Sequence, residues 1–487
     1  MPLRSGLLAI SLVFISTPAV ATGLYELTGS HGSLLPFSAR ITVSDTSLVY
    51  FNPALLTRVR PGLSMSIFGF AQALNIGYDA RPVGSDISGA IYSARLRLED
   101  GTTERLAYRP LPTADLRRER GTADPDALSG YISLGTVHHL LPGRLALGLH
   151  ATLPVAEFQA QSSFFPDQRE QFFSNSLHFE LLGDRTRVNI VSLALAGQPW
   201  KWLGIGAGLT MTTRGTVRSE VYVADATYQE TAEINAELGI DVAFVPHFSV
   251  AVEPLSDLLI SASVHLPYQS DVGGESSLQM WNYPYEEGQE SLSQVFSFTY
   301  GYEPLRLMLG ASWEHTVASG VGITLASWAR YARWSQYRNR HGERPEDSWS
   351  DTLSGNLGGT LQLGRHAVGL ELGFVPTPVP NQDGRDNYVD NHRLTGAMGW
   401  QLPVKLGGQE FQVGISTQLH YLLPRSQTKN LSASTPVFDE FADNAVDINS
   451  GDPVAAAQGL QTNNPGYPGY DHSGWLIGTA LFCKSSF

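Results

Sequence analysis

Alternation of apolar residues with small or polar ones is the feature that most limits how this chain can fold. Between residues 202 and 212 every second residue is apolar and the residues between are glycine or threonine: Leu203, Ile205, Ala207, Leu209 and Met211 against Gly204, Gly206, Gly208, Thr210 and Thr212. The pattern recurs near residues 145–153, 258–266, 353–363 and 411–421. Because side chains alternate between the two faces of a strand, each segment predicts a strand with one apolar face.

A soluble β-sandwich would show the same alternation, but three features favour a barrel in a membrane. The segments have the length of about ten residues that a tilted strand needs to cross the hydrocarbon layer. Short connections alternate with long ones in the first half of the chain. Aromatic residues cluster near segment ends, where an interfacial belt would place them: Trp200, Trp202, Trp313, Trp328, Trp334, Trp400 and Tyr421. We therefore expect an all-β, transmembrane antiparallel barrel of fourteen to sixteen strands, with a soluble β protein as the alternative.

The first 21 residues have the order of segments found in an export signal. Arg4 precedes a short apolar core at residues 7–15, and Thr17-Pro18-Ala19-Val20-Ala21 ends in a small-x-small pattern. The core is too short to span a bilayer as a helix, and a buried N-terminal helix is the alternative. We predict that residues 1–21 are a cleavable signal peptide.

Composition and motifs argue against several other classes of protein. The formal net charge of −14 disfavours nucleic acid as a partner, because phosphate binding needs clustered Lys and Arg. Cys483 is the single cysteine, so no internal disulfide framework is possible. The sequence has no nucleophile elbow, zinc-protease or phosphate-loop motif, and the adjacent His138 and His139 would face opposite sides of a strand. We expect no catalytic residue, no metal and no cofactor.

Asn52-Pro53-Ala54 stands in a compact apolar stretch between the signal and the first strand pattern. Pro53 fixes its own φ and pushes Asn52 toward extended geometry. The Asn52 side chain can cap backbone groups in the turn, Ala54 permits close packing, and Leu55 and Leu56 offer an apolar surface. Taken alone, the motif favours a surface turn that opens a short helix. Its place ahead of the barrel strands favours a rigid element of a plug inside the barrel.

Several further motifs follow in order along the chain. They are Pro199-Trp200-Lys201-Trp202 before a glycine-laced strand, Leu266-Pro267-Tyr268-Gln269-Ser270, Trp334-Ser335-Gln336-Tyr337, Pro378-Val379-Pro380 and Asn391-His392-Arg393-Leu394. Together with Asn52-Pro53-Ala54, this order resembles the FadL/TodX family of outer-membrane transporters for long-chain fatty acids and other hydrophobic compounds. The run at residues 32–40 and the long loop 424–472 depart from the family pattern and leave the ligand class open.

The resemblance implies a barrel of about fourteen strands, here residues 62–487, whose lumen is plugged by an N-terminal hatch, here residues 22–61. It implies passive uptake across the outer membrane of a Gram-negative bacterium. Fatty acids or aromatic hydrocarbons would be captured at the outer face, pass the moving hatch and leave sideways through the barrel wall. We expect a monomer that contacts outer-membrane lipids and is inserted by the barrel-assembly machinery. A general porin and a structural or adhesive barrel without a hydrophobic ligand are the alternatives.

The hatch also supplies the candidate ligand contacts. Phe37, Leu48, Phe51 and Leu55 are predicted to contact an apolar ligand, or else to fasten the hatch to the wall. Arg40, like Arg58, could meet a carboxylate head group or pair with acids of the lumen.

Overall fold

A computed structural model describes most of the chain after the predicted signal. The described residues are 23–78, 94–98, 100–105, 128–155, 179–182, 186, 189–212, 215–225, 230–240, 244–282, 290–339, 342–345, 347–382, 388–428, 445–447, 449–454 and 469–486. The predicted signal peptide, residues 1–21, lies outside these residues, and so does Phe487.

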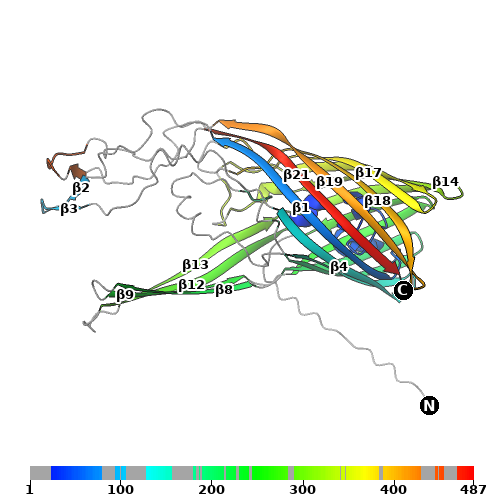
Figure 1. The fold of residues 1–487 in the computed structure, drawn as a ribbon, viewed down its shortest axis with the longest axis horizontal. Coiled ribbons are helices and arrows are strands. Elements are labelled where there is room, and N and C mark those ends of the chain that lie inside the picture. The colour runs from blue at the N-terminus through cyan, green and yellow to red at the C-terminus, as the bar shows by residue number, and fades with distance from the viewer. Residues whose placement is uncertain are drawn as a thin grey trace, which may run out of the picture.

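In the described part of the chain, fourteen strands close into one antiparallel barrel (Figure 1). They are β1 (Gly62–Tyr78), β4 (Leu128–Leu141), β5 (Leu145–Pro154), β6 (Ile190–Trp200), β7 (Leu203–Thr212), β10 (Phe244–Leu255), β11 (Leu258–His265), β14 (Arg306–Ala318), β15 (Val321–Ala332), β16 (Thr352–Leu363), β17 (His366–Val375), β18 (Arg393–Leu406), β19 (Gln409–Thr428) and β21 (Gly469–Ser486). Strand β1 closes the ring by pairing with β21 on one side and β4 on the other. The expected fold class and strand number are confirmed.

The two faces of the wall follow the predicted alternation. On β7 the side chain of Ile205 is 49% exposed, whereas Thr210 on the opposite face is only 1% exposed. On β16 Leu357 is 63% exposed and its neighbour Asn356 is 6% exposed. The apolar face therefore points outward, where a lipid bilayer can cover it, and the small or polar face lines the lumen.

Connections at the two ends of the barrel differ in length. Turns of two or three residues join β4 to β5, β6 to β7 and β10 to β11, and both Gly62 and Ser486 lie at this end. At the opposite end the chain makes long excursions. Two of them form a separate four-stranded sheet in the order β13-β12-β9-β8, which extends beyond the barrel (Figure 1).

This sheet consists of β8 (Gly215–Asp225), β9 (Glu230–Ile240), β12 (Tyr268–Asn282) and β13 (Glu290–Glu303). The long connections predicted in the first half of the chain therefore contain strands, among them β12 and β13. A smaller sheet at the same end joins β20 (Ala445–Asp447), β2 (Ala94–Arg97) and β3 (Thr103–Arg105).

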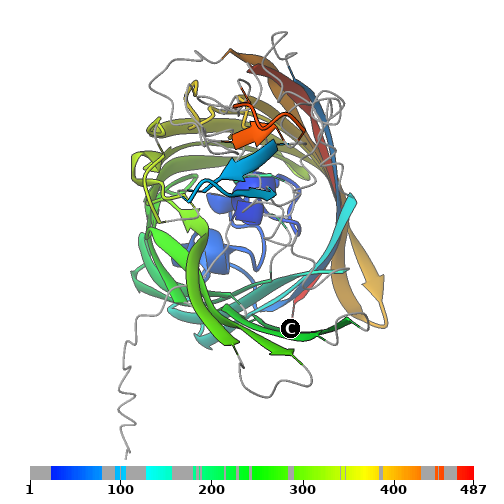
Figure 2. The ribbon, with the colours of Figure 1, turned by 90° about the vertical axis from the view of Figure 1, so that its left-hand side faces the viewer.

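The chain ahead of β1 lies inside the ring of strands (Figure 2). It forms α1 (Gly23–Thr28), the 3-10 helix η1 (Ser38–Arg40), α2 (Leu48–Phe51) and the 3-10 helix η2 (Pro53–Leu55). Nearly all of its side chains are buried. Within the described residues, no helix has both the length and the apolar character needed to span a membrane. We call residues 23–61 the N-terminal segment.

Some of the aromatic residues predicted to form an interfacial belt lie on the outer surface, and others do not. Trp200, Trp202 and Trp400 are 58%, 51% and 42% exposed on the outer surface. Trp328 and Trp334, by contrast, are 6% and 7% exposed, so their assignment to the belt was wrong. Trp328 points inward from β15, where Arg40 lies over its ring.

Candidate functional site

The Asn52-Pro53-Ala54 motif lies against the inner wall of the barrel. Asn52 has an extended backbone (φ −160°, ψ 77°), and Pro53 opens η2. The Asn52 Nδ2 donates two hydrogen bonds, each 3.0 Å long, to the Arg40 carbonyl oxygen and to Ser261 Oγ. The side chain makes no capping hydrogen bond to η2. It therefore joins η1 and α2 to strand β11, a role different from the predicted cap.

Glycines of β7 form the surface on which this motif rests. A Cβ added to Gly206 would lie 2.3 Å from the Ala54 backbone nitrogen, and one added to Gly204 would lie 2.5 Å from the Ala54 carbonyl oxygen. The Ala54 N–H donates to Ser249 Oγ on β10 over 2.8 Å. Because any larger residue would collide with backbone atoms, the glycine-laced strand seen in the sequence provides close contact with the motif.

The five residues predicted to contact a ligand are all buried inside the barrel: Phe37, Arg40, Leu48, Phe51 and Leu55. Leu48 and Leu55 are fully buried in an apolar cluster with Val137 and Ala194 of the wall. Phe51 packs among the rings of Tyr25 and Tyr50, and Phe37 meets His420 edge-on at 5.5 Å. These contacts fit the alternative that the residues fasten the segment to the wall. Their role toward a ligand stays a prediction.

Arg40 and Arg58 pair with acids, which was the alternative considered for both. Arg40 Nη1 lies 3.2 Å from Glu26 Oε2, and its guanidinium stands 4.6 Å from the ring centroid of Trp328. Arg58 pairs with Glu253 at the short-turn end of the barrel. As the structure stands, the guanidinium of Arg40 is not open to a head group, because its side chain is only 4% exposed, whereas the side chain of Arg58 is 17% exposed.

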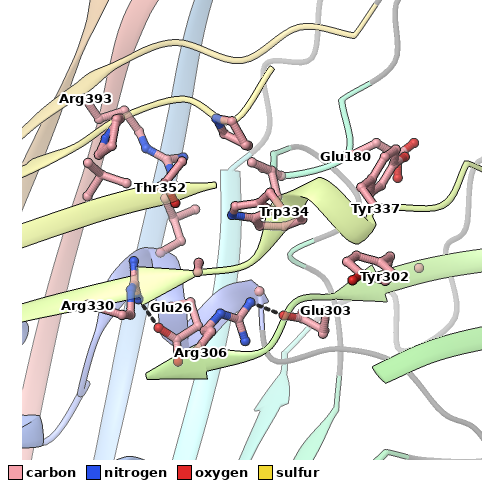
Figure 3. A pocket seen from close by; sticks show the side chains of 18 of the residues that line it. Glu26, Glu180, Tyr302, Glu303, Arg306, Arg330, Trp334, Tyr337, Thr352 and Arg393 are labelled. Atoms are coloured by element: carbon pink, nitrogen blue, oxygen red, sulfur yellow. Dashed lines mark hydrogen bonds and ion pairs between the residues drawn. The ribbon is translucent and has the colours of Figure 1, made fainter. Parts of the chain in front are cut away.

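A cavity of about 80 Å³ lies at the long-connection end of the N-terminal segment. Figure 3 shows it between Glu26 of α1 and residues at the ends of several strands. The cavity has a charged part and an aromatic part. The charged part is lined by Arg306, Arg330, Thr352 and Arg393, and the aromatic part by Trp334, Tyr337, Tyr302 and Pro378. We call this the Arg–Trp cavity. None of the five predicted ligand contacts lines it.

Ion pairs account for most of the charge around the Arg–Trp cavity. Glu26 pairs with both Arg330 and Arg40 and accepts a hydrogen bond from Tyr50 Oη over 2.9 Å. Arg306 pairs with Glu303. Burial alone would raise the pKa of Glu26, but Arg330 and Arg40 hold that pKa well below its ordinary value. Glu26 is therefore a carboxylate that fixes the end of the N-terminal segment to the wall.

The aromatic part of the cavity is supported from behind. Trp334 begins the 3-10 helix η5 (Trp334–Gln336), and its ring centroid is 5.4 Å from that of Trp349. Tyr337 stacks on Trp349 at 3.8 Å and meets Tyr388 edge-on at 5.7 Å. Such packing holds Trp334 and Tyr337 in one orientation.

The residues of the Arg–Trp cavity were missed as a site, although their segments were noticed in the sequence. Trp334 and Tyr337, Pro378 and Arg393 come from three of the ordered motifs. Each motif lies just outside or at the end of a strand, and the barrel closure brings all three to one place. The only sequence signal for the site was therefore the shared position of these motifs at strand ends.

The fold and the segment inside it define a class of protein: a transmembrane β-barrel with an occupied lumen. A FadL homologue from Pseudomonas aeruginosa has a similar structure, with a TM-score of 0.52 and 12% identity over 97% of this chain and 99% of that chain. The toluene transporter TbuX from Ralstonia pickettii gives a TM-score of 0.45 and 12% identity over 95% of this chain and 100% of that chain. No protein-family model and no curated protein matches the sequence. The chain has the fold of the FadL homologue, as the ordered motifs predict.

Proposed function

We propose that this protein is an outer-membrane channel of a Gram-negative bacterium that takes up long-chain fatty acids or similar hydrophobic compounds, including aromatic hydrocarbons. The outward apolar face suits a bilayer, and the fold is that of the FadL homologue. The occupied lumen gives the strongest support. A general porin needs an open, water-filled passage, and here a buried apolar segment lies across it.

In this proposal the N-terminal segment acts as a hatch, residues 22–61, within the barrel of residues 62–487. Asn52-Pro53-Ala54 is its rigid element, seated on the glycines of β7. Phe37, Leu48, Phe51, Leu55 and Arg40 would meet a ligand only after the hatch moves, because the wall covers them now. Movement of the hatch is thus required for passage.

A sideways exit through the barrel wall is part of this proposal. Transfer of apolar groups from water into an apolar environment, at about 0.8 kcal/mol per CH₂, would drive capture without an energy source. No cofactor enters this scheme. Contact with outer-membrane lipids, insertion by the barrel-assembly machinery and a monomeric state remain predictions.

Uptake by whole cells tests the function. A transporter-deficient Gram-negative strain that expresses this chain should accumulate labelled oleate, labelled toluene or both faster than the same strain with an empty vector. In planar bilayers the purified protein should give small, intermittent currents, because the lumen is occupied. Large, steady currents without uptake of either compound would identify a general porin instead.

A further inference from the structure

We propose that the Arg–Trp cavity binds a compact aromatic molecule that carries one carboxylate, with the carboxylate at Arg393 and Arg330 and the ring against Trp334 and Tyr337. This inference rests on the proposed function, since it names a substrate class for the same channel. Such a ligand differs from a neutral hydrocarbon in its carboxylate and from a long acyl chain in its aromatic ring.

Unused hydrogen-bond donors mark the charged part of the cavity. Arg393 and Arg330 are 8% and 7% exposed. Within the described residues, Arg393 Nη1 and Arg330 Nε have no hydrogen-bond partner. Figure 3 shows the Arg393 side chain reaching toward Thr352, whose hydroxyl is a further polar group on this side. Buried guanidinium donors without partners are costly, and a ligand oxygen would satisfy them.

The acids around the cavity leave Arg393 the least compensated cation. Glu26 is engaged by Arg330 and Arg40, and Glu303 by Arg306. Arg393 forms a longer ion pair with Asp390, whose Oδ1 lies 3.8 Å from Arg393 Nη1, and within the described residues neither carboxylate oxygen of Asp390 has a hydrogen-bond partner. Burial raises the pKa of Asp390, although Arg393 acts to lower it. Glu180 also lines the cavity, beside Tyr337 and away from Arg393 (Figure 3).

The aromatic part selects for shape. Trp334 and Tyr337 present ring surfaces that Trp349 and Tyr388 hold in place, and Pro378 adds a flat apolar surface. A planar ring gains stacking and edge contacts here that a flexible chain does not. The volume of about 80 Å³ admits about five to eight water-sized groups at roughly 10–15 Å³ each. A single ring with one carboxylate fits these limits better than a long acyl chain.

Four probes separate the contributions of ring and charge in the wild-type protein. Benzoate, benzamide, toluene and octanoate would be titrated against the purified full chain in detergent, with tryptophan fluorescence as the readout because Trp334 lines the cavity and Trp349 packs against it. We expect saturable binding of benzoate at least about tenfold tighter than that of neutral benzamide, a difference of about 1.4 kcal/mol. Toluene and octanoate should also bind more weakly. Equal affinity for benzoate and benzamide would overturn the proposal.

A charge-removing variant with a matched control gives the second test. Arg393→Gln should weaken benzoate binding at least about tenfold and leave toluene binding unchanged. Arg338→Gln, which removes a guanidinium that bonds the Gly342 carbonyl and does not line the cavity, should change neither. Loss of benzoate binding in both variants would show a general effect of charge and contradict the assignment. Heat-modifiable mobility on gels checks that each variant is folded, and the four-probe comparison needs no variant.

The same probes distinguish failure of this inference from failure of the proposed function. If toluene or oleate enters cells but benzoate binds no better than benzamide, the channel function stands and the carboxylate site is wrong. If benzoate binds as expected but cells take up no oleate and no toluene, the site stands and the proposed hydrophobic cargo is wrong.

Discussion

At the scale of single residues, His31 shows how the N-terminal segment depends on neutral histidine. Its ring stacks on Phe68 of β1 at 4.0 Å between centroids. Nε2 lies 2.9 Å from Thr28 Oγ1 and Nδ1 lies 3.1 Å from Ser133 Oγ on β4. Burial, with a smaller contribution from nearby His150, lowers the pKa of His31 to about 3. The docked segment therefore holds the uncharged ring.

Acidification should loosen this contact. The pKa of an undocked histidine is about 6.5, so the undocked state gains a proton first as the pH falls, and docking weakens between about pH 6.5 and 3. From pH 6.5 to 5 the loss from His31 should reach about 2 kcal/mol at most. Burial acts to raise the pKa of Asp45, but Lys484, Ser30 and Ser47 together lower it below its ordinary value, so its contribution is lost only at lower pH.

Hydrogen exchange of residues 23–61 measures this effect. His31→Gln should reduce the increase in exchange between pH 6.5 and 5, whereas His315→Gln, which changes a histidine 47% exposed on the outer surface, should not. An identical pH dependence in wild type and His31→Gln would exclude His31 as the group responsible.

At the scale of secondary-structure elements, the seat of the Asn52-Pro53-Ala54 motif on β7 can be tested by adding one methyl group. Gly206→Ala would place Cβ 2.3 Å from the Ala54 nitrogen and 2.5 Å from the Pro53 carbonyl carbon. Neither backbone atom can rotate away, so we expect η2 to be displaced and docking to weaken by about 1–3 kcal/mol. Protease cleavage within residues 40–60 should become faster.

Gly69→Ala is the control for this change, because a Cβ on Gly69 of β1 meets nothing within 4 Å. This variant also replaces a strand glycine by alanine, but the added methyl group does not touch the Asn52-Pro53-Ala54 motif. Equal protease sensitivity in the two variants would mean that the glycine is needed by the strand itself and not by the motif.

The elements also show which parts of the fold the sequence could predict. Strand faces at residues 203–212 and 352–363 were predictable, because a wall between lipid and lumen imposes strict alternation. The sheet of β8, β9, β12 and β13 was not: Glu230, Glu233 and Glu237 in β9 have no place on a lipid-facing strand, and this sheet lies outside the barrel. The Arg–Trp cavity depends on which strand ends meet, which follows from barrel closure and not from local pattern.

At the scale of the whole molecule, the barrel and its contents are held by different forces. The wall is a closed ladder of backbone pairing that begins at Gly62, where β1 joins both β21 and β4. The N-terminal segment adds side-chain contacts to that wall through its apolar cluster and through Glu26. Among the described residues ahead of Gly62, 23–61, none belongs to the ladder.

Deletion of residues 24–58 should therefore leave the barrel and open the lumen. The inner face is lined by polar side chains such as Ser133, Thr152, Ser192, Thr210 and Gln418, which water can solvate once the segment is gone. We expect heat-modifiable mobility on gels to persist and single-channel currents in planar bilayers to become large and steady, at least about tenfold above wild type. If the deleted chain no longer shows the folded band, the N-terminal segment is part of the folding core and not a separable plug. If the band persists and the current stays at the wild-type level, another part of the chain closes the lumen.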